Sequence, residues 1–220
     1  MELPLSKFYI KIMLIGLIAS ACTKDGKNIT VQGRVYNPVT GEGISDCEIR
    51  LVKESLELPG GNKTVLTVYP DANGYFELNH TSISARYVGC FFDNEKYAEI
   101  GWIQDGQNIG SSLVPVKRGK FTYLDCQAVT YSMVSTYIEN INCAGPADQM
   151  QFRFKTQFDD DYLYWSPIYT GCYSNTFVTQ KMSVGWRYYE TMVTRSGVTT
   201  YVYDTVFVTE NGITNVEILY

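Results

Sequence analysis

The chain has 220 residues and an acidic balance, with 18 Lys and Arg against 23 Asp and Glu and a net charge of −5. Because no basic stripe with interleaved aromatic residues interrupts this balance, the surface should repel phosphate backbones, and we expect no nucleic-acid partner. The single histidine, His80, excludes a zinc-hydrolase site built on two histidines, and no Gly-x-Ser-x-Gly motif is present. We therefore expect no enzyme, no catalytic residue, no metal and no cofactor, with His80 in an exposed turn at 79–82.

The chain opens with a short apolar run, 12–22, which follows Lys7 and Lys11 and ends at Cys22. A helix that spans a bilayer needs about 20 apolar residues, so this run is too short to cross one. A charged start, an apolar stretch and small residues before a cleavage point are typical of a secretory signal. The sequence therefore predicts a signal peptide over residues 1–21 and export of the chain.

The small residues 19–21, directly before Cys22, resemble the lipobox of bacterial lipoproteins, although Ala19 stands where that family usually has Leu. The resemblance implies that Cys22 is acylated, that residues 22–28 form a polar tether and that the lipid bilayer is a partner through the acylated N-terminus. It places the protein in the bacterial cell envelope, anchored to the outer membrane in a leaflet that stays open. The alternative is an ordinary signal peptide that leaves Cys22 as a free thiol.

From residue 29 onward, β-branched and aromatic residues alternate with polar ones, and clusters of Gly, Asn, Asp and Pro separate the segments. Helical periodicity is nearly absent, so the sequence predicts an all-β fold. The Asn73-Gly74 pair is typical of a tight turn between two strands. In the first half we expect strands over 29–36, 47–52, 65–69, 75–78, 87–92, 97–102 and 121–126.

The order of glycines and apolar residues over 29–78 resembles the carboxypeptidase regulatory-like domain. The matching residues are Val31-x-Gly33-x-Val35, Thr40-Gly41-x-Gly43-Ile44, Cys47-x-Ile49-x-Leu51 and Asp71-x-Asn73-Gly74-Tyr75-Phe76. The resemblance implies a transthyretin-like, seven-stranded β-sandwich over 29–127, and it identifies a fold rather than an activity. Gly33 would let a neighbouring backbone come close, and Gly74 would permit a left-handed turn.

The second half, 128–220, continues the alternation without that motif and predicts a second, Ig-like β-sandwich. A linker rich in Pro or Ser is missing at 127/128, so we expect the two sandwiches to abut. Trp186 shares its parity with Met182 and Val184, which predicts a core position. The acids at 159–161 are expected in a solvated hairpin turn rather than a cation site. Strands are expected over 131–138, 150–155, 162–165, 182–188, 189–194, 199–208 and 214–220.

Five cysteines follow Cys22, and their odd number leaves one thiol unpaired or paired with another molecule. Cys143 and Cys172 are alone in the second half, so we expect a disulfide between them in an oxidising compartment. The connectivity among the remaining three, Cys47, Cys90 and Cys126, stays open.

Aromatic residues are abundant, with 18 Tyr, 10 Phe and 3 Trp. Exposed Tyr and Trp are typical of surfaces that bind glycans or proteins. Our candidates for ligand binding are Trp102, which precedes a Gly-rich loop, and Tyr162, Tyr164 and Trp165, which neighbour the acidic turn. A core position is the alternative for each. Because Tyr164 and Trp165 are adjacent, we expect them to point to opposite faces of a strand.

These features predict a membrane-tethered, exported lipoprotein that acts as a non-catalytic binding or assembly module at the cell envelope. One alternative is a glycan-capture lipoprotein that serves polysaccharide uptake. Another is a subunit of a surface filament or adhesin, in which an edge strand pairs with a neighbour. The partner would be a glycan or an envelope protein.

Overall fold

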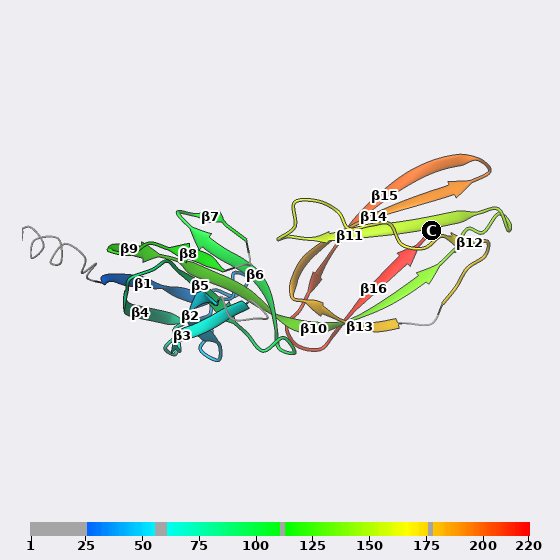
Figure 1. The fold of residues 1–220 in the computed structure, drawn as a ribbon. Coiled ribbons are helices and arrows are strands. Elements are labelled where there is room, and N and C mark those ends of the chain that lie inside the picture. The colour runs from blue at the N-terminus through cyan, green and yellow to red at the C-terminus, as the bar shows by residue number, and fades with distance from the viewer. Residues whose placement is uncertain (1–25, 56–60, 111–112, 176–177) are drawn as a thin grey trace, which may run out of the picture.

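The computed structural model describes residues 26–55, 61–110, 113–175 and 178–220. These residues form strands, turns and loops arranged as two consecutive β-sandwiches, which confirms the predicted fold class (Figure 1). The predicted signal peptide, the first part of the tether and Cys22 lie outside the described residues.

In the first sandwich, two sheets pack face to face. One sheet has the order β4-β1-β10-β6-β7, with β9 beside β1, and the other has the order β3-β2-β5-β8. The strands are β1 (Lys27–Tyr36), β2 (Glu48–Ser55), β3 (Gly61–Val68), β4 (Tyr75–Ser82), β5 (Arg86–Phe91), β6 (Tyr97–Gln104), β7 (Gln107–Asn108), β8 (Val114–Val116), β9 (Lys120–Tyr123) and β10 (Asp125–Glu139). His80 therefore lies within β4, and the expected turn at 79–82 is wrong because the β1 ladder extends to Ser82.

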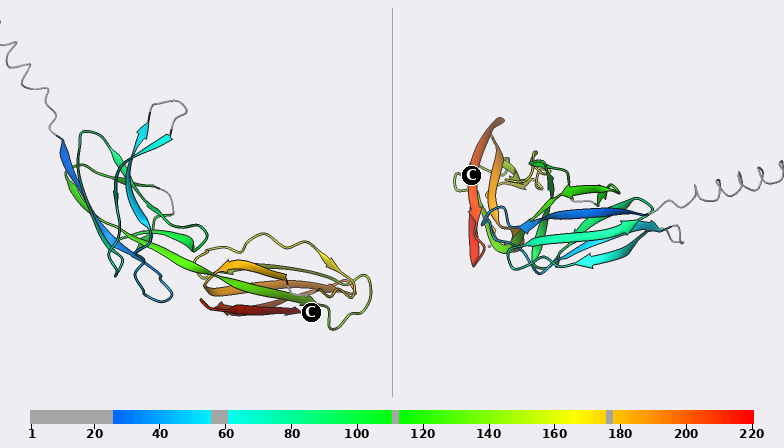
Figure 2. Two further views of the ribbon diagram at one scale, coloured as in Figure 1. Left: turned by 90° about the horizontal axis from the view of Figure 1, so that it is seen from below. Right: turned by 90° about the vertical axis from the view of Figure 1, so that its left-hand side faces the viewer.

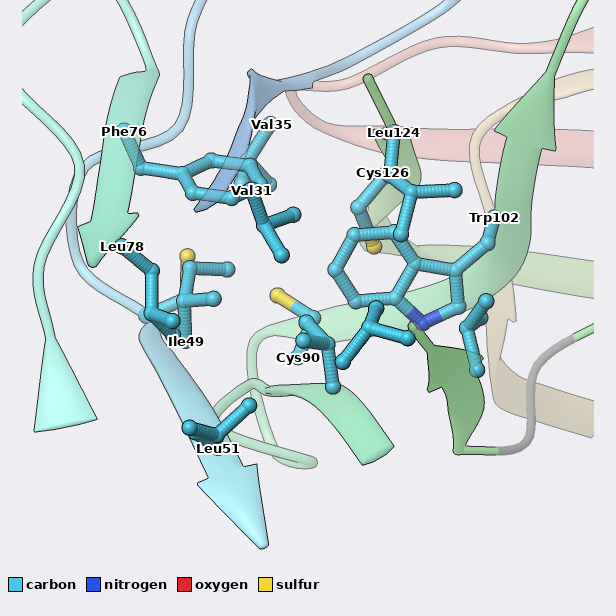
Figure 3. Close-up of a cluster of buried hydrophobic side chains, with 14 of the residues drawn as sticks. Val31, Val35, Ile49, Leu51, Phe76, Leu78, Cys90, Trp102, Leu124 and Cys126 are labelled. Carbon is cyan, nitrogen blue, oxygen red and sulfur yellow. The ribbon is translucent and has the colours of Figure 1, made fainter. Parts of the chain in front are cut away.

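The core of the first sandwich contains the alternate apolar residues of facing strands (Figure 3). Trp102 is 0% exposed there and meets Phe76 edge to face, with ring centroids 6.3 Å apart. The expectation that Trp102 binds a ligand is therefore wrong. The ladder between β6 and β10 shifts register between Gln127 and Ala128, so that Glu99 and Gly101 pair with consecutive residues. This β-bulge changes which positions of β6 face inward, and Trp102 points into the core.

A single strand, β10, belongs to both sandwiches (Figures 1 and 2). Its first residues pair with β6 as far as Thr130, and from Tyr131 onward it pairs with β13 and β16. The partners thus change three residues after the boundary expected at 127/128. A second link is an ion pair of 2.8 Å between Lys181 and Glu95, one from each sandwich. Because the connection is itself a paired strand, the two sandwiches abut without an intervening loop.

The second sandwich packs the sheet β12-β11-β14-β15 against β13, the second part of β10, and β16. Its strands are β11 (Gln149–Thr156), β12 (Tyr169–Thr170), β13 (Val178–Ser183), β14 (Gly185–Arg195), β15 (Val198–Val208) and β16 (Ile213–Leu219). The segment 162–165, expected to be a strand, is irregular, although Leu163 still donates its N–H to the carbonyl of Phe154.

Trp186 is 46% exposed, so the core position predicted for it is wrong. The strand pattern breaks at Val184, between β13 and β14, and Gly185, the first residue of β14, has a φ of 119°. Up to the break Met182 and Val184 face inward, and after it Arg187 and Tyr189 do. A backbone conformation that glycine readily adopts thus changes the inward-facing residues from even-numbered to odd-numbered ones. The indole of Trp186 therefore points to the outer face of the sheet.

Candidate binding surface on the second sandwich

A row of three polar side chains crosses the outer face of the β11-β14-β15 sheet. Arg153, Glu190 and Tyr203 occupy directly paired positions on the three strands. Arg153 donates Nε–H to Glu190 Oε2 at 2.5 Å, and the Tyr203 hydroxyl donates to Glu190 Oε1 at 3.2 Å. This hydrogen bond to the carboxylate raises the pKa of Tyr203. The row lies on three paired strands and is therefore rigidly positioned.

Aromatic side chains from the loop after β11 surround this row. The Arg153 guanidinium lies 5.0 Å from the ring centre of Tyr162 and 4.5 Å from that of Trp165, in cation–π geometry. Both rings are half-buried, whereas Tyr164 is 100% exposed. Trp165 and Tyr164 therefore differ in exposure, although the segment is not the expected strand.

A second aromatic pair lies on the same face toward the first sandwich. Trp186 and Phe207 sit opposite each other on β14 and β15, and their ring centroids are 5.2 Å apart in an edge-to-face arrangement. The face thus offers aromatic surface on both sides of the Arg153 row.

The strand β15 is exposed on both faces and forms the edge of its sheet. Tyr201 and Tyr203 are 52% and 66% exposed on one face, and Val202 is 53% exposed on the other. It pairs with β14 along its whole length, and within the described ranges no strand pairs with its opposite edge. This surface therefore combines exposed rings with an open backbone edge.

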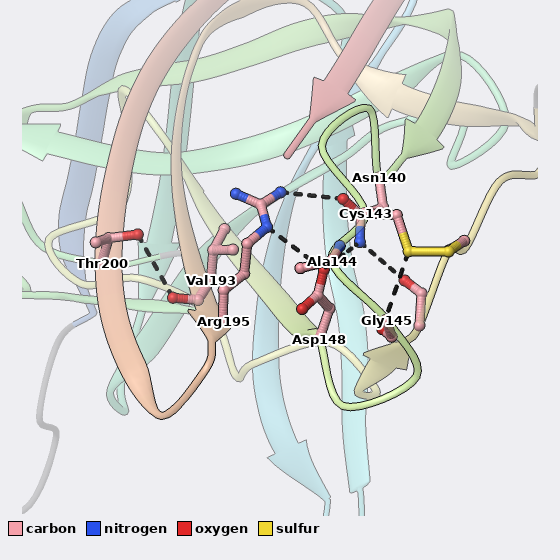
Figure 4. Close-up of polar contacts among 10 residues, drawn as sticks. Asn140, Cys143, Ala144, Gly145, Asp148, Val193, Arg195 and Thr200 are labelled. Atoms are coloured by element: carbon pink, nitrogen blue, oxygen red, sulfur yellow. Dashed lines mark hydrogen bonds and ion pairs between the residues drawn. A yellow bond between two sulfur atoms is a disulfide. The ribbon is translucent and has the colours of Figure 1, made fainter.

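A polar network with a disulfide holds the tip of the β14–β15 hairpin (Figure 4). The structure joins Cys143 to Cys172, the pair that the sequence favoured. Nearby, Arg195 at the end of β14 donates to Asn140 Oδ1 at 3.0 Å and lies 3.5 Å from the carboxylate of Asp148. The backbone N–H of Ala144 and the side chain of Asn140 both donate to Asp148 and lower its pKa. The far end of the second sandwich is thus firmly cross-linked.

The residues singled out from the sequence do not form one site. Tyr162, Tyr164 and Trp165 lie together on the second sandwich, whereas Trp102 is in the core of the first, and Cys22 is outside the described residues. Cys47, Cys90 and Cys126 are buried free thiols in the first sandwich.

Sequence reasoning missed the row itself. Arg153, Glu190 and Tyr203 meet only when β11, β14 and β15 pair in one particular register. A weak signal was available, since the charged Arg153 and Lys155 alternate with apolar residues and so mark the outer side of their strand.

The first sandwich has a groove of about 550 Å³ beside β2, β5 and β6. Its walls include Arg50, Phe91 and Glu99, and the Arg50 guanidinium stacks 4.2 Å from the centre of the Phe91 ring. Glu99 is an exposed residue, but reduced solvation at the wall raises its pKa to about 6. Arg50 is already engaged by Glu48 at 2.6 Å, so the groove offers little free positive charge to a ligand.

Within the described residues, no group of three or more His, Cys, Asp or Glu side chains is placed so that it could hold a metal ion. The same part of the chain contains no helix with the length and hydrophobicity of a membrane span.

No family model and no curated protein matches the chain. Among solved structures, it is similar to a DUF3823 family protein from Bacteroides uniformis, at 14% identity and a TM-score of 0.31, with 83% of this chain and 100% of that chain covered. It is also similar to the minor pilin of Streptococcus agalactiae, at 8% identity and a TM-score of 0.37, with 87% and 94% covered. A streptococcal ancillary pilin matches at 11% identity and a TM-score of 0.33, with 88% and 62% covered. At these scores, function has to be derived from the surface of this chain.

Proposed function

We propose that this protein is an exported, non-catalytic binding or assembly module, tethered to the cell envelope through an acylated Cys22. The observation that carries the proposal is the position of the exposed edge strand β15. β1 starts at the end of the first sandwich that points away from the second one, and β10, which begins beside Val35 near the end of β1, leads into the second sandwich (Figures 1 and 2). A tether at the N-terminal end would therefore leave β15 and its aromatic face pointing outward from the membrane.

In this role the chain works by positioning. The paired strand β10 joins the two sandwiches directly, so that the second one is held at a set height above the anchor. The open edge of β15 offers backbone hydrogen bonds, and the rings of Tyr201 and Tyr203 offer contact area. Neither element needs a reactive group, which agrees with the single histidine of the sequence.

Crosslinking in intact cells tests the binding role. A photo-crosslinking amino acid replaces Tyr203 in one variant and Tyr69 in the other, since both side chains are 66% exposed and both hydroxyls donate to a glutamate. We expect discrete adducts from position 203 and none from position 69. Equal labelling at both positions, or none at either, would contradict the proposal.

Fractionation tests the tether. We expect the parent protein in the membrane fraction and Cys22→Ala in the soluble fraction, because a chain without acyl groups loses its hydrophobic anchor. Membrane retention of Cys22→Ala would rule out anchoring through this cysteine.

A second candidate function is glycan capture, which the rings around Arg153 favour. Tyr164 is fully exposed beside Tyr162 and Trp165, and exposed rings next to polar groups suit the faces and hydroxyls of sugars. Affinity electrophoresis against a panel of polysaccharides should then show retardation that Tyr164→Ala and Trp165→Ala reduce and Tyr69→Ala leaves unchanged. Migration unaffected by every polysaccharide would eliminate this function.

A further inference from the structure

The free edge of β15 has a defined set of hydrogen-bonding groups. The turn between β14 and β15 contains Ser196 and Gly197, with φ angles of 49° and 77°, the positive pair of a two-residue type I′ hairpin. In such a hairpin the flanking residues Arg195 and Val198 form a hydrogen-bonded pair, and bonded and non-bonded pairs then alternate. The odd-numbered residues from Thr199 to Phe207 therefore direct their N–H and C=O groups away from β14.

One contact supports this assignment independently. The N–H of Thr205, an odd-numbered residue, is bound by the carboxylate of its own neighbour Asp204 at 2.7 Å. An N–H engaged in the β14 ladder would point away from that carboxylate. The outward groups of β15 thus form a regular row along a strand of eleven residues.

Apart from Asp204, whose carboxylate binds the outward N–H of Thr205, the sequence of β15 lacks the devices that usually keep an edge strand from pairing. It contains no Pro, Gly, Lys or Arg, and its single charged residue is Asp204. Natural edge strands are normally short, bulged, covered or protected by such residues. A long, nearly uncharged edge that is rich in Val, Thr and Tyr therefore suits a mate strand of the same composition.

We propose that the mate is β15 of a second copy of this chain, paired antiparallel about a two-fold axis at Tyr203. This proposal rests on the proposed binding or assembly function and names the partner. Tyr203 is the midpoint of Val198–Val208, so this register pairs all eleven residues. It also sets Tyr203 opposite its copy at a position whose backbone groups point outward, as a hydrogen-bonded pair requires.

The charges agree with this register. Asp204 lies opposite Val202 of the other copy, and the two Asp204 carboxylates meet only on the diagonal, about 7–8 Å apart across exposed positions where solvent and salt screen them. A register centred on Asp204 would oppose the two carboxylates directly, and 204 has its backbone groups turned toward β14. Registers centred on Tyr201 or Thr205 leave four residues of each strand unpaired.

The direction of β15 fixes how the two copies lie. The strand starts next to Arg195, at the disulfide-linked far end, and finishes opposite Gly185, at the junction with the first sandwich. It therefore runs along the molecule, and antiparallel pairing places the two N-terminal ends at opposite ends of the pair. Two tethered copies joined in this way would link two facing membranes rather than neighbours on one membrane.

Cysteine crosslinking of the full chain tests the register. Directly opposed residues of a hydrogen-bonded antiparallel pair have Cα atoms about 5.5 Å apart, within disulfide range. Under mild oxidation we expect Tyr203→Cys to form a disulfide-linked dimer by itself. Tyr201→Cys and Thr205→Cys should each stay monomeric alone and form a mixed dimer when combined, because position 201 opposes position 205 and lies about 14 Å from its own copy. The parent chain, with its native cysteines, should give no dimer.

A backbone variant tests the pairing without a crosslink. Tyr201→Pro removes an N–H that points outward and leaves the β14 ladder intact, so we expect self-association in sedimentation to weaken at least tenfold, whereas Tyr201→Phe should match the parent. Vesicles that carry the full parent chain should aggregate, whereas vesicles that carry the full Tyr201→Pro chain should not. If Tyr203→Cys gives no dimer while a photo-crosslinker at position 203 still captures another molecule, self-pairing is overturned and the binding function stands. If neither reacts, both fail.

Discussion

Arg153 and Glu190 face each other across β11 and β14, with Arg153 Nε 2.5 Å from Glu190 Oε2, and the rings of Tyr162 and Trp165 lie against the same guanidinium. The Glu190 side chain is almost fully buried, whereas that of Arg153 is about one-third exposed. The ion pair therefore satisfies a carboxylate that the surrounding rings have removed from water.

Loss of Arg153 should leave this carboxylate poorly satisfied. We expect Arg153→Ala to lower the free energy of unfolding by about 1–3 kcal/mol, measured by urea denaturation, since among the described residues only the Tyr203 hydroxyl would remain as a donor. Lys155→Ala is the matched control, two residues along the same strand; it removes an exposed hydrogen bond to the Asp160 carbonyl and a contact with the Tyr162 ring, and it should change stability by less than Arg153→Ala does. In a Glu190→Gln background the effect of Arg153→Ala should shrink. An equal effect in both backgrounds would mean that packing, not charge, dominates.

The disulfide between Cys143 and Cys172 should stabilise the second sandwich. It closes a loop with a sequence separation of 29, for which the chain-entropy model gives about 3–4 kcal/mol. We expect the double variant Cys143→Ala/Cys172→Ala to have a free energy of unfolding that is lower by that amount. Its stability should not change when a reductant is added. The parent should lose the same stability when dithiothreitol is added. If the melting temperature of the parent does not change with the reductant, the disulfide contributes little to stability.

Gly33 lies where two backbones touch. A Cβ at this position would sit 1.7 Å from the carbonyl oxygen of Leu124, so Gly33→Ala must push β1 away from the start of β10. We expect a loss of more than about 2 kcal/mol in thermal or chemical unfolding. Gly61→Ala is the control, because a Cβ there meets no atom of the described residues within 4 Å, and it should be neutral to about 0.5 kcal/mol.

Glu99 should make stability depend on pH near neutrality. Reduced solvation raises its pKa to about 6 in the folded chain, above about 4.3 for an unperturbed glutamate. A raised carboxyl pKa means that the unfolded state loses its proton first, so stability is complete below about pH 4 and falls as the pH rises through 6. Glu99→Gln should therefore be more stable than the parent at pH 7–8 and equal to it near pH 4. The gain should stay below about 1 kcal/mol because the residue is exposed. Glu42→Gln, which changes an exposed turn residue, should show no such difference.

Much of the fold follows from local pattern. The alternation of Ile29, Val31 and Val35 in β1 gives the buried face directly, and Gly33 and Gly74 occupy positions where only a glycine fits, as the sequence indicated. Which alternate residues of a strand face the core can be predicted only where the hydrogen-bonded ladder is regular. The bulge before Trp102 and the break at Gly185 each reverse the inward face, and the glycines there, Gly101 and Gly185, are only weak signs of it because a glycine in a strand can also mark a close backbone approach.

The candidate surface was harder to predict than the fold. Tyr162, Tyr164 and Trp165 stood out because they cluster in sequence, and they do lie on the outer face. Arg153, Glu190 and Tyr203 are up to 50 positions apart, and only the pairing register brings them together. Likewise, the exposed edge of β15 depends on which strand comes last in the sheet, a property of topology rather than of local sequence.

The strand shared by both sandwiches has a mechanical consequence. β1 and β10 run parallel and pair at Val35 and Cys126, while β9 continues the same alignment along Ile29–Gln32. Tension between the N-terminal end and the far tip would pull these strands in opposite directions along their length. The hydrogen bonds between them would then bear the load together in shear, instead of opening one after another as in a zipper.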